Sequence, residues 1–196
     1  MKKLIYFITS IIVIFGISGC AGRGTGAVSS KISKFDNSKE VIMQTAWVAP
    51  AEGGIAEISL GMTYRTSTPD VLYLLVNITK MTDYKIRSVA FNIDGETIIP
   101  TKDKEETKTN DLQVTNDTCT YSYGIRTCTK GLKMKQSDKL FIAPSNLAKK
   151  ILKAKKAFIR VDVGSKFIEG DLKADSFGNH VFKDSLNEFV QKMQSN

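Results

Sequence analysis

The sequence predicts an α+β fold, mainly an antiparallel β-sheet or sandwich with a short amphipathic helix and a C-terminal helix. Three observations support this prediction. Runs of β-branched and aromatic residues, separated by Pro, Gly and Asp breaks, recur along the chain from residue 41 to residue 163. Two β-prone arms flank Tyr123-Gly124, as in a hairpin. Apolar residues at helical spacing appear twice in the last third of the chain.

The β-prone runs predict the strands in order. The runs that share this composition are Val41 to Val48, Ala56 to Tyr64, Val71 to Thr79, Lys139 to Ala143 and Ala157 to Val163. From Val71 to Ile78 nearly every position is apolar, which predicts a central strand buried on both faces. Asp94-Gly95 lies between two further apolar stretches within 86–99 and predicts a tight hairpin. The charged stretch 101–110 predicts a mobile loop.

Two helices complete the predicted domain. Pro144-Ser145 marks the start of the first, with apolar residues on one face and Lys149, Lys150 and Lys153 on the other. The second begins after Asp175, and its near-helical spacing predicts that its apolar face docks on the sheet. These apolar residues are Phe177, Val181, Leu186, Phe189, Val190 and Met193.

The first residues have the order of a secretory leader. Lys2 and Lys3 precede an apolar run from Leu4 to Ile17, and small residues then lead to Cys20. The run is about 14 residues long, whereas a helix needs about 20 to cross the hydrocarbon core. We therefore expect a cleaved leader over residues 1–19 rather than a permanent transmembrane anchor.

The segment Ile17-Ser18-Gly19-Cys20 resembles the lipobox of bacterial lipoproteins. The resemblance implies that the Cys20 thiol receives a diacylglyceryl group and that cleavage exposes its amine for a further acyl chain. Two or more acyl chains anchor a protein stably to a membrane. In this class, Asp after the cysteine resembles an inner-membrane signal, and this chain has Ala21. The resemblance thus implies an outer-membrane protein facing the periplasm.

The residues after the cysteine predict the domain organisation. The stretch 21–30 is rich in Gly, Ser and Ala, which is typical of a flexible tether. We expect the lipidated cysteine and tether to occupy residues 20–34, and a single β-rich domain to occupy residues 35–196. That length is sufficient for one domain with its own core.

The other two cysteines, Cys119 and Cys128, form an even pair, as expected in an oxidising compartment. If Tyr123-Gly124 is the hairpin loop, these cysteines face each other at a non-hydrogen-bonded position, within reach of a disulfide. The alternative is half of a metal site. We favour the disulfide, because the chain has one His and no further free Cys.

A search for catalytic residues predicts no enzyme. His180 is the sole imidazole, and no acidic orienting residue is adjacent to it. The scattered carboxylates Asp162, Glu169 and Asp171 do not define an acid–base pair, and no pattern predicts a metal or cofactor site. An envelope hydrolase for peptidoglycan or lipid, with an unrecognised carboxylate site, is the alternative.

Two groups of residues are candidates for partner binding. The first comprises Tyr121, Tyr123 and Arg126 near the predicted hairpin tip, because aromatic residues and Arg are common at interface hot spots. Its alternative is that one face packs on the sheet. The second comprises the three lysines of the first helix, which attract anionic lipid or lipopolysaccharide if they converge. Its alternative is a solvated helix face.

The leading hypothesis is thus a non-enzymatic binding or assembly module for an envelope protein or an anionic envelope component. An accessory subunit of a secretion or surface machine is another alternative. Nucleic acid is not expected as a partner, because the chain has no aromatic stacking motif.

Overall fold

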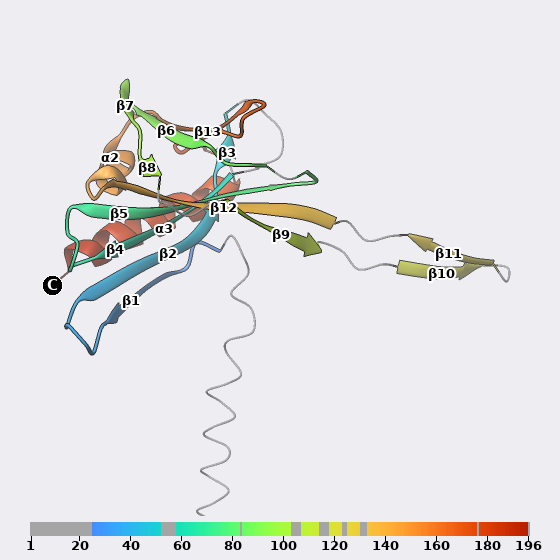
Figure 1. Ribbon diagram of the computed structural model, residues 1–196, viewed down its shortest axis with the longest axis horizontal. Helices are drawn as coiled ribbons and strands as arrows, with labels where there is room; N and C mark the ends of the chain where they lie inside the picture. Colours follow the sequence, from blue (N-terminus) through green and yellow to red (C-terminus); the bar gives the residue numbers. More distant parts are fainter. Residues whose placement is uncertain are drawn as a thin grey trace, which may run out of the picture.

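We describe the fold from a computed structural model, for residues 25–51, 58–82, 84–102, 107–113, 118–122, 125–129, 133–175 and 177–195. Antiparallel strands dominate these residues, and two helices accompany them (Figure 1). The predicted α+β fold is therefore confirmed.

The larger sheet, sheet A, has seven strands in the order β1-β2-β4-β5-β12-β8, with β9 also paired to β12. Its strands are β1 (Val28–Ile32), β2 (Lys39–Trp47), β4 (Ile58–Arg65), β5 (Val71–Lys80), β8 (Thr101–Lys102), β9 (Lys108–Gln113) and β12 (Lys133–Pro144). Strand β9 pairs with the first half of β12, and β8 pairs with Phe141 and Ile142 near its end.

The smaller sheet, sheet B, has five strands in the order β3-β14-β13-β6-β7. They are β3 (Ala49–Pro50), β6 (Ser88–Ile93), β7 (Glu96–Ile98), β13 (Ala157–Asp162) and β14 (Phe167–Asp171). The chain crosses between the sheets at Val48, because β2 belongs to sheet A and β3 to sheet B. It passes between the sheets again from β3 to β4, from β5 to β6, from β7 to β8 and from β12 to β13, so the two sheets are joined covalently at several points.

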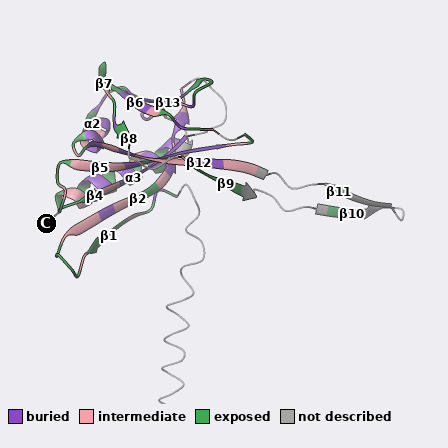
Figure 2. Ribbon diagram, viewed as in Figure 1, coloured by how far each residue is buried: buried purple, intermediate pink, exposed green. Residues whose placement is uncertain are grey.

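The helices are α2 (Leu147–Lys153) and α3 (Phe177–Gln194), and α3 packs on β1, β2 and α2. One hydrophobic core joins both helices to both sheets, and Figure 2 shows it in purple. The buried apolar residues of α3 are Phe182, Leu186, Phe189 and Val190. Val181 was predicted to dock on the sheet, and this was wrong: Val181 is 39% exposed, because the helix turns Phe182 toward the core instead.

The predicted hairpin at Asp94-Gly95 is confirmed as the β6–β7 turn. Asp94 has φ 49° and Gly95 has φ 93°, a left-handed pair of the kind that tight hairpins require. The Asn92 side chain accepts a hydrogen bond from the Gly95 amide at 3.1 Å. Local side-chain chemistry therefore determines this turn.

Two other predictions were wrong in detail. The stretch 101–110, predicted as a loop, contains β8 and the start of β9, whose polar residues pair with β12. Strand β5 is central in sheet A, but only one of its faces is fully buried. Leu75 on the other face is 38% exposed, because the outer side of the sheet is partly open at this position.

The tether predicted over residues 20–34 is wrong over its second half, and the domain begins well before residue 35. Thr25 bridges to Ala46, the Gly26 amide donates to the Thr45 carbonyl at 3.3 Å, and β1 pairs with β2. Gly26 has φ 65°, and an added Cβ would lie 2.2 Å from the Ser185 Oγ of α3. The glycine therefore permits close packing on the helix, which composition alone did not reveal.

We predict that Gly26→Ala lowers the free energy of unfolding by about 1–3 kcal/mol, because it combines backbone strain with overpacking. Gly95→Ala is the matched control: its φ is also positive, but no atom lies within 4 Å of an added Cβ. Urea denaturation should show the smaller loss for the control. Adding Ser185→Ala to Gly26→Ala should recover part of the loss. Equal losses for the two glycine variants would contradict the close packing.

Candidate functional site

The outward face of sheet B carries a hollow that is a candidate for partner binding. Along β13, Ala157, Ile159 and Val161 are buried, so the intervening Phe158 and Arg160 point outward. Strand β14 continues the pattern, because Glu169 lies opposite Arg160 in the register. The alternation of the two strands thus places an aromatic ring, a cation and an anion on one open surface.

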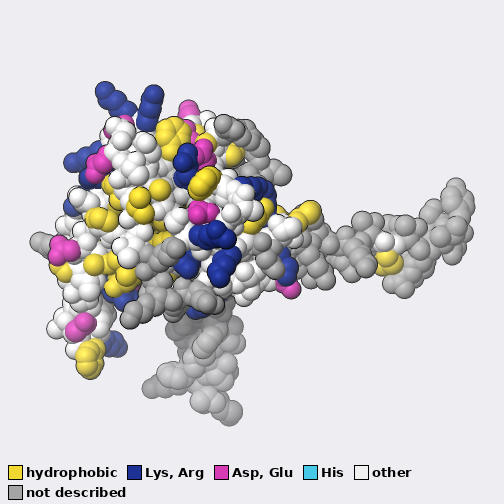
Figure 3. All heavy atoms as spheres, turned by 45° about the horizontal axis from the view of Figure 1, so that its top comes forward, with side chains coloured by type: hydrophobic (Ala, Val, Ile, Leu, Met, Phe, Trp, Pro, Cys, Tyr) yellow, Lys and Arg dark blue, Asp and Glu magenta, His cyan; other side chains and the backbone are white. Residues whose placement is uncertain are grey.

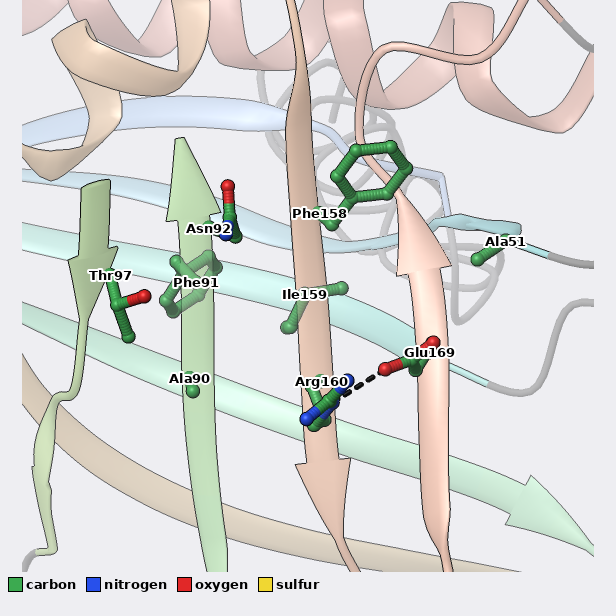
Figure 4. A pocket seen from close by; sticks show the side chains of 9 residues that line it. All are labelled: Ala51, Ala90, Phe91, Asn92, Thr97, Phe158, Ile159, Arg160 and Glu169. Carbon is green, nitrogen blue, oxygen red and sulfur yellow. Dashed lines mark hydrogen bonds and ion pairs between the residues drawn. The ribbon is translucent and has the colours of Figure 1, made fainter. Parts of the chain in front are cut away.

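The hollow has a volume of about 500 Å³, and Figure 4 shows its lining. Its lining residues are Ala51, Ala90, Phe91, Asn92, Thr97, Phe158, Ile159, Arg160 and Glu169. The small side chains of Ala51 and Ala90 leave room between the larger ones. The residue Phe158 is 38% exposed, so part of its ring is available to a ligand.

An ion pair organises one side of the hollow. The Arg160 Nε lies 2.5 Å from the Glu169 Oε1, and the Arg160 guanidinium lies 5.3 Å from the centre of the exposed Phe167 ring. Apolar, basic and acidic side chains lie side by side on the face that Figure 3 brings forward. The hollow therefore offers apolar contact and both charges to a partner, a combination suited to an amphipathic segment.

The sequence reasoning missed this hollow. It treated Glu169 as an isolated carboxylate and did not predict β14. The available sequence signal was the pair of two-residue alternations, Phe158 with Arg160 and Phe167 with Glu169, each beside a buried residue. Without the pairing of β13 and β14, these alternations could not be placed on one surface.

The three lysines predicted as an anionic-ligand site do line one pocket, of about 350 Å³. However, Asp94 and Glu96 of the β6–β7 hairpin line the same pocket. The Lys150 ammonium lies 2.7 Å from Glu96 Oε1. The pocket containing Lys149, Lys150 and Lys153 is therefore of mixed charge rather than a uniformly basic patch.

The predicted hairpin is formed by β10 (Thr118–Ser122) and β11 (Ile125–Thr129), in the predicted register. The Cys119 and Cys128 sulfur atoms lie 2.15 Å apart, at disulfide distance. Figure 1 shows the hairpin projecting beyond β9 and β12, away from the two sheets. Tyr123, the side chains of Tyr121 and Arg126, and Cys20 lie outside the described parts of the structure.

The other carboxylates considered in the sequence stabilise turns. Asp162 accepts a hydrogen bond from the Gly164 amide at 2.7 Å, and Asp171 accepts one from the Lys173 amide at 2.7 Å. His180 is exposed, and its Nε2 lies 3.4 Å from Asp175 Oδ1. Among the described residues, no group of three or more His, Cys, Asp or Glu side chains is arranged to hold a metal ion.

The Asp94 carboxylate ties the β6–β7 turn to the segment after α2. It accepts hydrogen bonds from the Lys156 amide at 2.8 Å and the Lys155 amide at 3.1 Å. These bonds, led by that of Lys156, hold the pKa of Asp94 below its ordinary value. A lowered pKa means that Asp94 stabilises the fold fully above about pH 4 and progressively less as the pH falls.

We predict that Asp94→Asn lowers the urea midpoint at neutral pH and that the difference from the native protein narrows below about pH 4. The amide retains an acceptor oxygen and tolerates the left-handed backbone, so the variant isolates the charge. Asp175→Asn, at an exposed carboxylate, is the control. A constant difference between Asp94→Asn and the native protein across this pH range would contradict the prediction.

No protein-family model, curated protein or solved structure matched this chain. Neither helix in the described part has both the length and the apolar character needed to cross a bilayer. What the domain does must therefore follow from its own residues and their geometry.

Proposed function

We propose that the protein is a lipoprotein of the bacterial envelope, anchored through lipid on Cys20 to the outer membrane and facing the periplasm. Its domain acts as a non-enzymatic binding or assembly module for an envelope protein or an anionic envelope component. The observation that carries the proposal is the lipobox-like segment Ile17-Ser18-Gly19-Cys20 after a basic and apolar leader.

The start of the fold supports this assignment. The described fold starts with the bridge of Thr25 to Ala46, five positions after Cys20, so removal of residues 1–19 would leave every described element intact. Cleavage before Cys20 would then give a folded domain with this cysteine as its N-terminal residue. This is the arrangement that lipid attachment at Cys20 requires.

Two surfaces support a binding role. The hollow of sheet B combines an exposed aromatic ring with the Arg160–Glu169 pair, and the β10–β11 hairpin projects from the body of the domain. Among the described residues, the carboxylates Asp162 and Asp171 are engaged by turn amides, and Glu169 is engaged by Arg160. No observation in this part of the chain favours the alternative of a hydrolase.

We predict that the native protein incorporates labelled palmitate and partitions into the detergent phase, whereas Cys20→Ser does neither. The variant lacks the thiol that carries the lipid, and two or more acyl chains are what hold such a protein to a bilayer. The double variant Cys119→Ser with Cys128→Ser is the control, and it should still be labelled. Labelling of Cys20→Ser, or an unlabelled native protein, would contradict the anchor.

A separate variant tests the assignment to the outer membrane. Ala21→Asp should move the labelled protein from the outer to the inner membrane fraction in a diderm host. An unchanged distribution would contradict the role of residue 21 in sorting, while leaving the lipid anchor in place.

We predict that a photoreactive amino acid at Phe158 crosslinks to a specific envelope component in intact cells. Ile99 is the matched control position, because it is also an exposed apolar residue but lies outside the hollow. Arg160→Ala should weaken the crosslink from Phe158, because it removes the cation of the hollow. The same products from both positions would contradict specific binding at the hollow.

A further inference from the structure

The turn between β1 and β2 exposes two large apolar side chains, Ile32 and Phe35. Phe35 is fully exposed and Ile32 is 70% exposed, more than any other large apolar residue there. In Figure 3, apolar, basic and acidic side chains lie together at the lower left, where Figure 1 places this turn. Single exposed apolar residues are common, so the surroundings of the pair decide its meaning.

Hydrogen bonds fix the backbone of this turn. Asp36 Oδ1 accepts from the Ser38 hydroxyl at 2.8 Å and from the Ser38 amide at 3.1 Å. The Ser33 amide donates to the Ser38 carbonyl at 2.8 Å, and Asn37 has the left-handed φ of 56°. The turn therefore holds Phe35 outward in a defined conformation. Because the loop is already ordered, binding would not incur the entropic cost of ordering it.

Basic side chains flank the two apolar residues. Lys34 is exposed, and Lys31 remains exposed although its ammonium lies 2.6 Å from Glu40 Oε2. Apolar side chains with adjacent lysines suit the boundary of an anionic bilayer, where rings enter the acyl region and ammonium groups meet headgroup phosphates.

The proposed anchor brings the same strand close to a membrane. Thr25 lies five positions after Cys20, and a chain of that length reaches at most about 18 Å. Strand β1 starts three residues later, lies at the edge of sheet A and leads directly into the turn. Among the described strands, β1 is thus the one nearest to the lipid along the chain.

We infer that the β1–β2 turn is a second membrane contact, in which Ile32 and Phe35 enter the surface of an anionic phospholipid bilayer beside Lys31 and Lys34. This inference rests on the proposed lipid anchor. The turn adds an orientation that one flexible attachment cannot supply. Figure 1 shows the turn and the β10–β11 hairpin at opposite ends of the longest axis, so this contact directs the hairpin away from the membrane.

The test uses the full lipidated protein in vesicles of phosphatidylethanolamine and phosphatidylglycerol with brominated acyl chains, which quench nearby tryptophan. Phe35→Trp should show a blue shift and a loss of emission relative to unbrominated vesicles. Ile99→Trp, at a residue of similar exposure to Ile32, should show neither change. The emission of the native protein, which comes from Trp47, is subtracted from that of each variant. Ile32→Trp provides a second probe of the turn.

The outcomes separate the two proposals. Unquenched tryptophans at both positions 32 and 35, in protein that floats with the vesicles, would overturn the turn contact and leave the anchor standing. Burial of these tryptophans in a dimer or a protein complex instead of lipid would overturn it as well. Protein that does not float with the vesicles would overturn the anchor, and the inference with it. Quenching that weakens without phosphatidylglycerol would support the role of the lysines.

Discussion

The inner face of sheet A must be kept from water across its width, and the arrangement of the other elements follows from this constraint. The strands β4 and β5 carry buried apolar residues at alternate positions, including Leu60, Leu72 and Leu74. Helix α3 covers β1 and β2, whereas sheet B lies above the central strands (Figure 1). Because both covers join one continuous core, neither sheet is expected to fold without the other.

This division of the core decides which surfaces remain for binding. Sheet B is covered on one face only, so alternate side chains of β13 and β14 reach solvent and create the hollow. Its charges are paired within the molecule, as are Lys150 and Glu96 near α2. Net charge alone is therefore a poor guide to the binding surfaces, although the whole chain is formally +8. Shape and exposed aromatic rings distinguish the hollow more clearly.

The sequence predicted the elements whose signals are local. The Asp94-Gly95 turn and the register of Cys119 with Cys128 depend on nearby residues, and α2 begins shortly after Pro144-Ser145 as expected. Strand β9 was missed because Lys108–Gln113 is polar and depends on β12 for its pairing. Strand β14 was missed because it is short and contains Gly170, whose missing side chain accommodates Val48. Strand β9 thus depends on β12, and β14, which carries Glu169 of the hollow, depends on contacts with Val48 and β3.

Because Thr25 bridges to Ala46 and Gly26 packs closely on α3, only four residues lie between Cys20 and the described domain, instead of the expected 14. If Cys20 carries lipid as proposed, a connection of that length would convert a three-dimensional search for partners into one confined to a thin layer above the bilayer. Confinement of this kind gives effective concentrations of about millimolar for sites within range and almost none beyond it. A weak interaction would then suffice for a neighbour at the same membrane. Selectivity among envelope components would come from their distance to the bilayer as well as from their chemistry.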